Sequence, residues 1–263
     1  MSATPPITAL ILAGSSPPEK DRLIEYTRGG SKALIPIAGK PMIAYVIQAL
    51  SGSQYIRQMV VVGFEELLDV ESPVPIDCLP APGGLVDNFL TGVQHILDQW
   101  PETVAIVGSS SDIPLITTPM VDDFIATCLG SDYDLYYNVV ERSVMEARFP
   151  ASKRSYVRLR EGSFAGGDLS MLRPAAMQAN LELVRALAGE RKNARNQARL
   201  IGWRTLALLL LGRLSIPRAE ALVSQVLGVR GRLVISPHPE IGMDVDKPLQ
   251  LEIVRAELEG CAA

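Results

Sequence analysis

The first half of the chain alternates between short apolar runs and stretches whose apolar residues recur at helical spacing. Residues 7–13 form one such run, rich in β-forming residues and typical of a strand buried on both faces. Later elements follow the same alternation and are expected at 41–50 (helix), 58–63 and 76–79 (strands), 85–100 (helix), and 103–107, 134–140, 156–159 and 169–172 (strands). Strands that alternate with helices in this way predict a mainly parallel α/β sheet flanked by helices.

The pattern changes to helix from residue 175 to residue 228. Three helices are expected there, at about 181–189, 193–211 and 217–227, the last with Ser215 as a cap. A strand at 232–235 and a helix at 248–258 then close the chain. We therefore predict a single domain over 1–263 with an embedded helical subdomain at 175–228.

Composition and charge narrow the class of protein. A net charge of −4 argues against general nucleic-acid binding. The three cysteines, Cys78, Cys128 and Cys261, lack the spacing of a metal site, and we interpret them as reduced thiols in a cytoplasmic protein. The N-terminus has no signal-peptide pattern. The longest apolar run, 206–211, is too short to cross a bilayer and predicts burial within the subdomain or at a homodimer contact.

Several loop residues could carry chemistry. Gly14-Ser15-Ser16 follows the first strand, and such a loop exposes backbone N–H groups that can hold phosphate oxygens. Lys32, at the far end of the loop, adds a positive charge. Asp112 follows a strand and is either a ligand-binding carboxylate at the sheet edge or a turn carboxylate. Asp246, with its neighbour Asp244, is either a metal ligand or the cap of the last helix.

The order of these motifs resembles the MobA-like NTP transferases. The resemblance rests on Leu-Ala-Gly at 12–14, Ser-Lys-Ala-Leu at 31–34, Asp-Ile-Pro-Leu at 112–115, Phe-Ala-Gly-Gly-Asp-Leu at 164–169 and Asp-Lys-Pro-Leu at 246–249. It covers about 7–174 and 231–260. It implies a Rossmann-like GT-A-type fold with a mixed, mainly parallel sheet. The implied activity is transfer of a nucleoside monophosphate from an NTP to a phosphorylated small-molecule acceptor, with release of pyrophosphate.

The resemblance also implies roles for individual residues. Lys32, Asp112 and Asp246 would be catalytic, and the two aspartates would hold Mg²⁺ between substrate phosphates. The nucleotide would be held by Leu12, Ala13, Gly14, Ser15 and Lys32, with Gly83, Gly84 and Asn88 beside the base. The acceptor would lie against Gly166, Gly167 and Asp168, although a β-bulge explains these three residues equally simply.

Some assignments stay open at this stage. The family usually has a second glycine where Ser15 stands, and either Arg22 or Arg28 could serve the triphosphate. Lys40 is either a phosphate ligand or part of a turn. His95 and His238 lack an evident catalytic partner and are interpreted as structural. The basic residues Arg191, Lys192, Arg195 and Arg199 form either a solvated helix face or a surface that meets an acidic acceptor.

An alternative function is a catalytically silent nucleotide-binding module that acts through its helical insertion. A nicotinamide-dependent oxidoreductase would need Gly-x-Gly-x-x-Gly after the first strand, and this chain lacks it. The identity of the base and of the acceptor is left open by the sequence.

Overall fold

A mixed β-sheet forms the centre of the protein. The computed structural model describes residues 5–14, 22–27, 30–66, 70–176, 208 and 211–260 of the 263. Eight strands form the sheet: seven follow the order β10-β7-β9-β6-β1-β4-β5, and β8 pairs with β9 at one side. In chain order they are β1 (Ile7–Leu12), β4 (Ile56–Val62), β5 (Ile76–Leu79), β6 (Ala105–Ser110), β7 (Leu135–Glu141), β8 (Val157–Arg158), β9 (Ser163–Leu172) and β10 (Gly231–Ser236).

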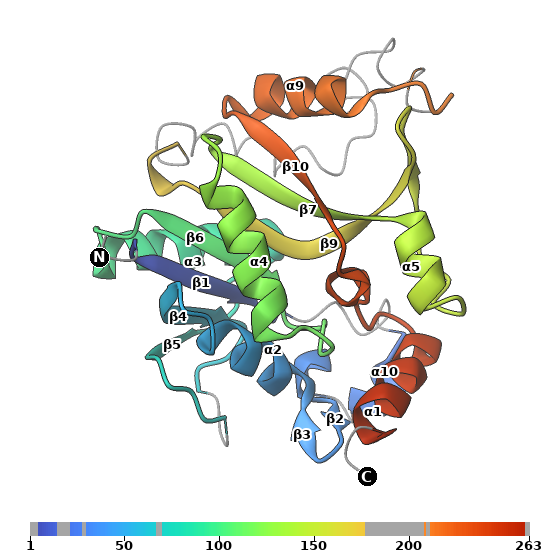
Figure 1. Cartoon of the computed structure of the whole chain (residues 1–263). Coiled ribbons are helices and arrows are strands. Elements are labelled where there is room, and N and C mark those ends of the chain that lie inside the picture. The colour runs from blue at the N-terminus through green and yellow to red at the C-terminus, as the bar shows by residue number, and fades with distance from the viewer. Residues whose placement is uncertain are drawn as a thin grey trace.

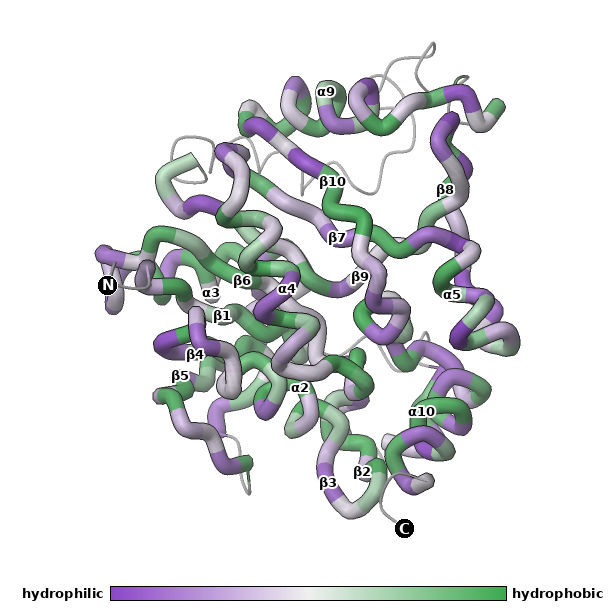
Figure 2. The backbone as a smooth tube through the Cα atoms, in the orientation of Figure 1, coloured by the Kyte–Doolittle hydropathy of each residue, from purple (hydrophilic) through white to green (hydrophobic). Residues whose placement is uncertain are grey.

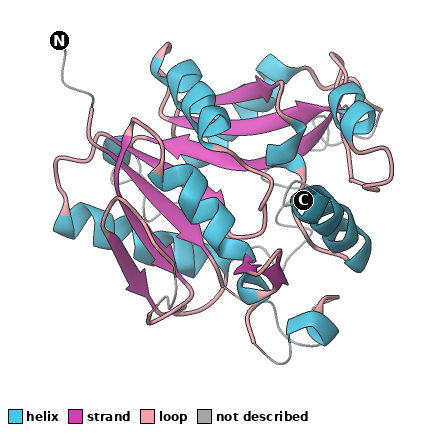
Figure 3. Cartoon of the chain, turned by 60° about the horizontal axis from the view of Figure 1, so that its bottom comes forward, coloured by secondary structure: helices cyan, strands magenta, loops and turns pink. Residues whose placement is uncertain are grey.

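Helices cover both faces of this sheet: in Figure 3 the strands lie between helices on either side. The described helices are α1 (Ile24–Thr27), α2 (Met42–Ser51), α3 (Leu85–Gln99), α4 (Thr118–Leu129), α5 (Arg142–Arg148), α9 (Ile216–Leu227) and α10 (Pro248–Gly260), with single turns η2 (Lys32–Leu34) and η4 (Pro239–Gly242). A small hairpin of β2 (Pro36–Ile37) and β3 (Lys40–Pro41) leads into α2.

The first strand illustrates why this sheet forms. In β1, Ala9 and Ile11 belong to the core shared with α2 and α4, whereas Leu10 belongs to the core on the other face, under α3. All three side chains are fully buried. A strand buried on both faces needs an unbroken apolar sequence. Figure 2 shows the resulting concentration of hydrophobic residues along the central strands.

The expected fold class is confirmed, including its mixed character. Strands β1, β4, β5 and β6 run parallel, as do β7 and β10. Strand β9 is antiparallel to both β6 and β7, and it joins the two parallel groups. It is also longer than the 169–172 expected from the sequence, since it begins at Ser163.

Two helices that the sequence analysis did not predict, α4 and α5, complete the described core. In α4, Val121, Phe124, Ile125 and Cys128 are buried, at the spacing of one helix face. The sequence therefore contained the apolar stripe from which α4 could have been predicted.

Part of the predicted insertion lies outside the described residues, namely 177–207, 209 and 210, and the embedded subdomain stays a prediction. Its last helix is present as α9, beside β10 at one end of the sheet (Figure 1). Ser215 occupies the N-cap position of α9, but its side chain makes no capping hydrogen bond. Within the described ranges, none of the helices is both long and apolar enough to span a membrane.

Candidate active site

Two acidic side chains meet at the carboxyl edge of the sheet. Asp112 follows β6, and Asp246 lies in the segment between η4 and α10. The Val245 N–H donates to the Asp112 carbonyl oxygen at 2.9 Å, which fixes the two segments side by side. The Asp246 N–H in turn donates to Gln250 Oε1 at 2.9 Å. Residues far apart in sequence are thus held together by backbone contacts.

Lys32 lies between the two carboxylates. Its Nζ donates to Asp112 Oδ2 at 2.5 Å and to Asp246 Oδ1 at 2.8 Å. Lys32 opens the single turn η2, where the Ser31 Oγ accepts the Ala33 N–H. Burial opposes the charge of Lys32, but the two carboxylates outweigh it and raise its pKa above the ordinary value. Burial of Asp246 is likewise outweighed by Lys32, so the pKa of Asp246 is lowered.

A cavity of about 800 Å³ opens beside this triad. Its lining includes seven of the residues predicted from the sequence: Leu12, Gly14, Lys32, Asp112, Gly167, Asp168 and Asp246. It also includes Arg22, Phe89, Tyr137 and Lys247. Of the two candidate triphosphate arginines, Arg22 lines the cavity, whereas Arg28 and also Ser15 lie outside the described residues. The carboxyl edge of the sheet is the usual ligand position in open α/β folds.

Other predicted residues are not part of the cavity lining. Asn88 is 3 % exposed, and its Oδ1 accepts the Gly83 N–H at 3.3 Å. A Cβ on Gly14 would lie 2.3 Å from Asn88 Nδ2, so only glycine fits there. Asn88 therefore joins the loop before α3 to the loop after β1. Ala13, Gly83, Gly84 and Gly166 are likewise absent from the described lining.

The segment around Gly167 is a bulge in β9. Tyr137 pairs with Ser170 and Val139 pairs with Gly166, so Gly167, Asp168 and Leu169 span the interval opposite Asn138 alone. A Cβ on Gly167 would lie 2.2 Å from Asn138 Oδ1, which explains the glycine. Gly167 and Asp168 therefore form a β-bulge and also line the cavity. Burial, with the Asp112 charge second, raises the pKa of Asp168 to about 7.

Sequence reasoning missed Arg154. This residue forms an ion pair with Asp244, and the two side chains are only 13 % and 12 % exposed. The positive charge of Arg154 also opposes the rise in the pKa of Asp168 and contributes to the lowered pKa of Asp246. The neighbouring Asp244 is thus engaged by an arginine, whereas Asp246 faces the cavity. No spacing or motif around Arg154 in the sequence signals this pairing.

The two aspartates fit the requirements of a Mg²⁺ ion. Asp112 Oδ1 is buried and has no hydrogen-bond partner. Carboxylate oxygens are the protein ligands that Mg²⁺ prefers, usually one or two of them together with waters and substrate phosphates. Among the described residues, no group of three His, Cys, Asp or Glu side chains gathers around one point. Substrate phosphates and water would therefore supply the remaining ligands.

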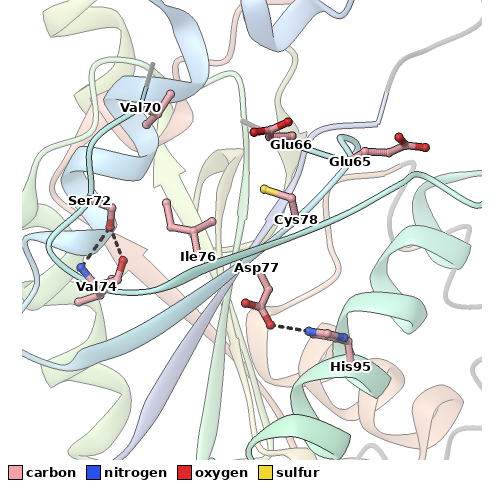
Figure 4. Close-up of a pocket in the computed structure, with 9 residues that line it drawn as sticks. All are labelled: Glu65, Glu66, Val70, Ser72, Val74, Ile76, Asp77, Cys78 and His95. Carbon is pink, nitrogen blue, oxygen red and sulfur yellow. Dashed lines mark hydrogen bonds and ion pairs between the residues drawn. The ribbon is translucent and has the colours of Figure 1, made fainter. Parts of the chain in front are cut away.

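The two histidines and Lys40 take no part in this cavity lining. His95 Nε2 lies 2.8 Å from Asp77 Oδ2, and its ring stands edge-on to Trp100. Figure 4 shows this pair at a second cavity of about 560 Å³ along β5, with Cys78 directed away from His95. His238 Nε2 lies 3.0 Å from Asp123 Oδ2. Lys40 Nζ lies 3.5 Å from Gln48 Oε1, beyond the turn at Ala38 and Gly39.

Comparison with known proteins decides the family. The sequence matches the MobA-like NTP transferase domain over residues 9–202. The chain belongs to this family. Its members are nucleotidyltransferases, so the transferase class follows from the match. The match ends before Asp246, so the position of that residue beside Asp112 comes from the fold alone. No protein of curated function matches the sequence.

Solved structures share the same fold. A hypothetical transferase from Thermus thermophilus is 36 % identical, with a TM-score of 0.78, over 93 % of this chain and 98 % of that one. A CMP:2-keto-3-deoxy-manno-octonic acid synthetase complexed with CTP is 15 % identical (TM-score 0.55; 97 % and 98 % covered). The 4-diphosphocytidyl-2C-methyl-D-erythritol synthase from Anaerococcus prevotii is 10 % identical (TM-score 0.59; 96 % and 98 % covered).

Proposed function

We propose that this family member transfers a nucleoside monophosphate from an NTP to a phosphorylated small-molecule acceptor, with Mg²⁺ as cofactor. The observation that carries the proposal is the convergence of Lys32, Asp112 and Asp246 at one end of an 800 Å³ cavity. In the reaction, an oxygen of the acceptor phosphate attacks the α-phosphorus of the NTP, and the bond to the β-phosphate oxygen breaks. Pyrophosphate leaves, and the product is a phosphate anhydride.

The chain's own residues position the substrates for this step. Gly14 borders the cavity beside Leu12, and the backbone N–H groups of the loop that begins there would hold the triphosphate. Lys32 and Arg22 provide positive charge in the same cavity. Mg²⁺ held by Asp112 and Asp246 would neutralise charge on the transferring phosphoryl group. The acceptor phosphate is already ionised near neutral pH, so the step needs no protein base.

The acceptor side of the cavity would be formed by the β9 bulge. Gly167 and Asp168 line the cavity at the bulge, and Gly166 precedes them in β9. The acceptor phosphate would approach from this side, opposite the nucleotide loop. Two structural neighbours are named for an octonic acid and for an erythritol derivative, which is consistent with a polar acceptor here.

A silent nucleotide-binding module is the second candidate. One observation favours it: Lys32 Nζ itself fills the gap between the two carboxylates. A permanent internal cation of this kind would let the protein bind NTP without a metal and without turnover. The two candidates differ in whether pyrophosphate is released.

The deciding experiment measures pyrophosphate release with each of the four NTPs and a panel of phosphorylated acceptors in the presence of Mg²⁺. We expect release with one NTP and its loss by at least about 10³-fold in Asp112→Asn and in Asp246→Asn. The matched control is Glu252→Gln, which removes one negative charge from an exposed position on α10. NTP binding without release under every condition would favour the silent module.

A cytoplasmic location is also part of the proposal. The buried Cys128 is a free thiol, as expected for a reducing compartment, and Cys261 lies outside the described residues.

A further inference from the structure

A third cavity, which is apolar, shares Tyr137 with the candidate active site. It has a volume of about 260 Å³ and lies between α9 and the strands β7 and β10. Its apolar lining residues are Leu135, Tyr137, Ala219, Val223 and Leu233. Tyr137 and Leu233 are paired neighbours in the sheet, as are Leu135 and Gly231. Ala219 and Val223 lie four residues apart, so one face of α9 covers these strands.

The charged residues at this cavity are already paired with the protein. Arg232 lies 3.7 Å from Glu220, and Glu220 Oε1 also accepts the Leu233 N–H at 2.9 Å. Glu220 is therefore used to join α9 to β10. Because these charges are satisfied internally, the cavity is suited to an uncharged, apolar group.

Tyr137 connects this apolar cavity to the candidate active site. Its side chain lines both cavities, and it is 45 % exposed, so its ring is open to a ligand. On the active-site side it stands over the β9 bulge, where a Cβ on Gly166 would lie 2.8 Å from the tyrosine hydroxyl oxygen. A ligand that occupied both cavities would therefore lie against Asp168 at one end and pass Tyr137 toward α9.

We propose that the apolar cavity is a subsite for the acceptor, and that the acceptor carries an aliphatic chain or an aromatic ring in addition to its phosphate. This proposal rests on the proposed nucleotidyl transfer, and it names the acceptor class. The phosphate end would lie near Asp112 and Asp246, and the apolar end would lie between α9 and β7. The volume is sufficient, since a cavity of about 150 Å³ already holds benzene.

The test uses n-alkyl phosphates of increasing length, from methyl to octyl, below their micelle concentrations. Binding to the full-length protein is measured by titration calorimetry, with the matching n-alkyl alcohols in a parallel series. Once the chain is long enough to pass Tyr137, each added methylene should tighten binding about fourfold. The alcohols should bind at least tenfold more weakly, since they lack the phosphate.

Two variants that fill the cavity report on its position. Val223→Trp and Ala219→Phe should each remove the chain-length dependence while methyl phosphate and NTP binding change by less than about twofold. Gln225→Trp is the matched control, because Gln225 is exposed on the same helix and is not among the cavity residues. It should keep the chain-length dependence of the unmodified protein. Thermal unfolding of each variant checks that the protein is still folded.

Two results would overturn the subsite: an affinity independent of chain length, or chain-length dependence that survives in both cavity-filling variants. Failure of the proposed function is distinguished by the pyrophosphate assay. If alkyl phosphates bind with the expected length dependence but no NTP yields pyrophosphate, nucleotidyl transfer is wrong and the apolar site stands as a binding site. If only acceptors without an apolar group are turned over, nucleotidyl transfer stands and the apolar subsite is wrong.

Discussion

At the scale of single residues, Lys32 links two carboxylates that would otherwise repel each other. Its removal in Lys32→Met should weaken NTP binding more than acceptor binding, because Lys32 lies on the nucleotide side of the cavity. Asp246 is 56 % exposed, so the stability loss should stay below the about 3–5 kcal/mol of a fully buried pair, and we expect about 2 kcal/mol. Nucleotide and acceptor KM values, together with urea unfolding, measure both effects.

The stability lost in Lys32→Met should depend on pH, because the pKa of Asp246 is lowered in the folded protein. A carboxyl with a lowered pKa in the folded state contributes stability above its unfolded value of about 4, and this contribution disappears as pH falls. The difference in the free energy of unfolding between the unmodified protein and Lys32→Met should therefore have its full value at pH 7 and shrink below about pH 4. A difference that is constant down to pH 3 would contradict the ion pair, and Lys40→Met is the control outside the cavity.

A second residue-scale prediction concerns the thiols. Cys128 is fully buried, and burial raises its pKa to about 12. Its thiolate fraction at pH 8 is then about 10⁻⁴, so it should not react with a disulfide reagent while the protein is folded. In a Cys261→Ser background, we expect Cys78 to react first and Cys128 only after addition of denaturant. Equal rates for the two thiols would show that α4 opens readily.

At the scale of elements, the Arg154–Asp244 pair holds the segment that carries Asp246. Arg154→Met leaves the buried Asp244 carboxylate without its counter-ion, which should cost about 3–5 kcal/mol. If the pair also positions Asp246, the variant should raise the Mg²⁺ concentration needed for half-maximal activity. Arg154→Lys should restore part of the stability, and the double variant Arg154→Met with Asp244→Leu most of it.

Normal Mg²⁺ dependence in a destabilised Arg154→Met protein would show that the pair is structural only. The readouts are urea unfolding and a Mg²⁺ titration of activity for each variant. Arg148→Met is a matched control, because Arg148 pairs with Glu257 at 2.6 Å on an exposed surface away from the cavity.

Individual elements show how far the sequence could predict the fold. Strand β1 and helix α3 have clear periods, and they lie where expected, within one or two residues. The bulge in β9 could not be predicted, because it depends on Asn138 in another strand. The same holds for the site: the motif positions identified Asp112 and Asp246, but only the fold brings Lys32 between them and Arg154 behind them.

At the scale of the whole molecule, the two parallel strand groups meet at β9, and the cavity lies along this junction. The predicted insertion follows β9 in the chain and returns through α9 and β10. Two residues of its apolar run are described: Leu208 packs against a buried cluster on β7, β9 and Leu214, whereas Leu211 is 64 % exposed. We therefore propose that this region contributes to a homodimer. Sedimentation at micromolar concentration should give a dimer. A folded monomer at this concentration would contradict the proposed homodimer.

The last prediction separates folding from metal binding. Lys32 already bridges the two carboxylates and offsets one of their two charges, and the described residues hold no cluster of three or more metal-ligating side chains. A chelator should therefore leave the melting temperature within about 4 °C of its value in Mg²⁺, while pyrophosphate release falls to background and returns when Mg²⁺ is restored. Addition of the correct NTP with Mg²⁺ should raise the melting temperature more than NTP with chelator, because the nucleotide phosphates complete the ligand set. A chelator-induced drop of about 10 °C or more, on the order of several kcal/mol, would instead mean that a metal holds the fold.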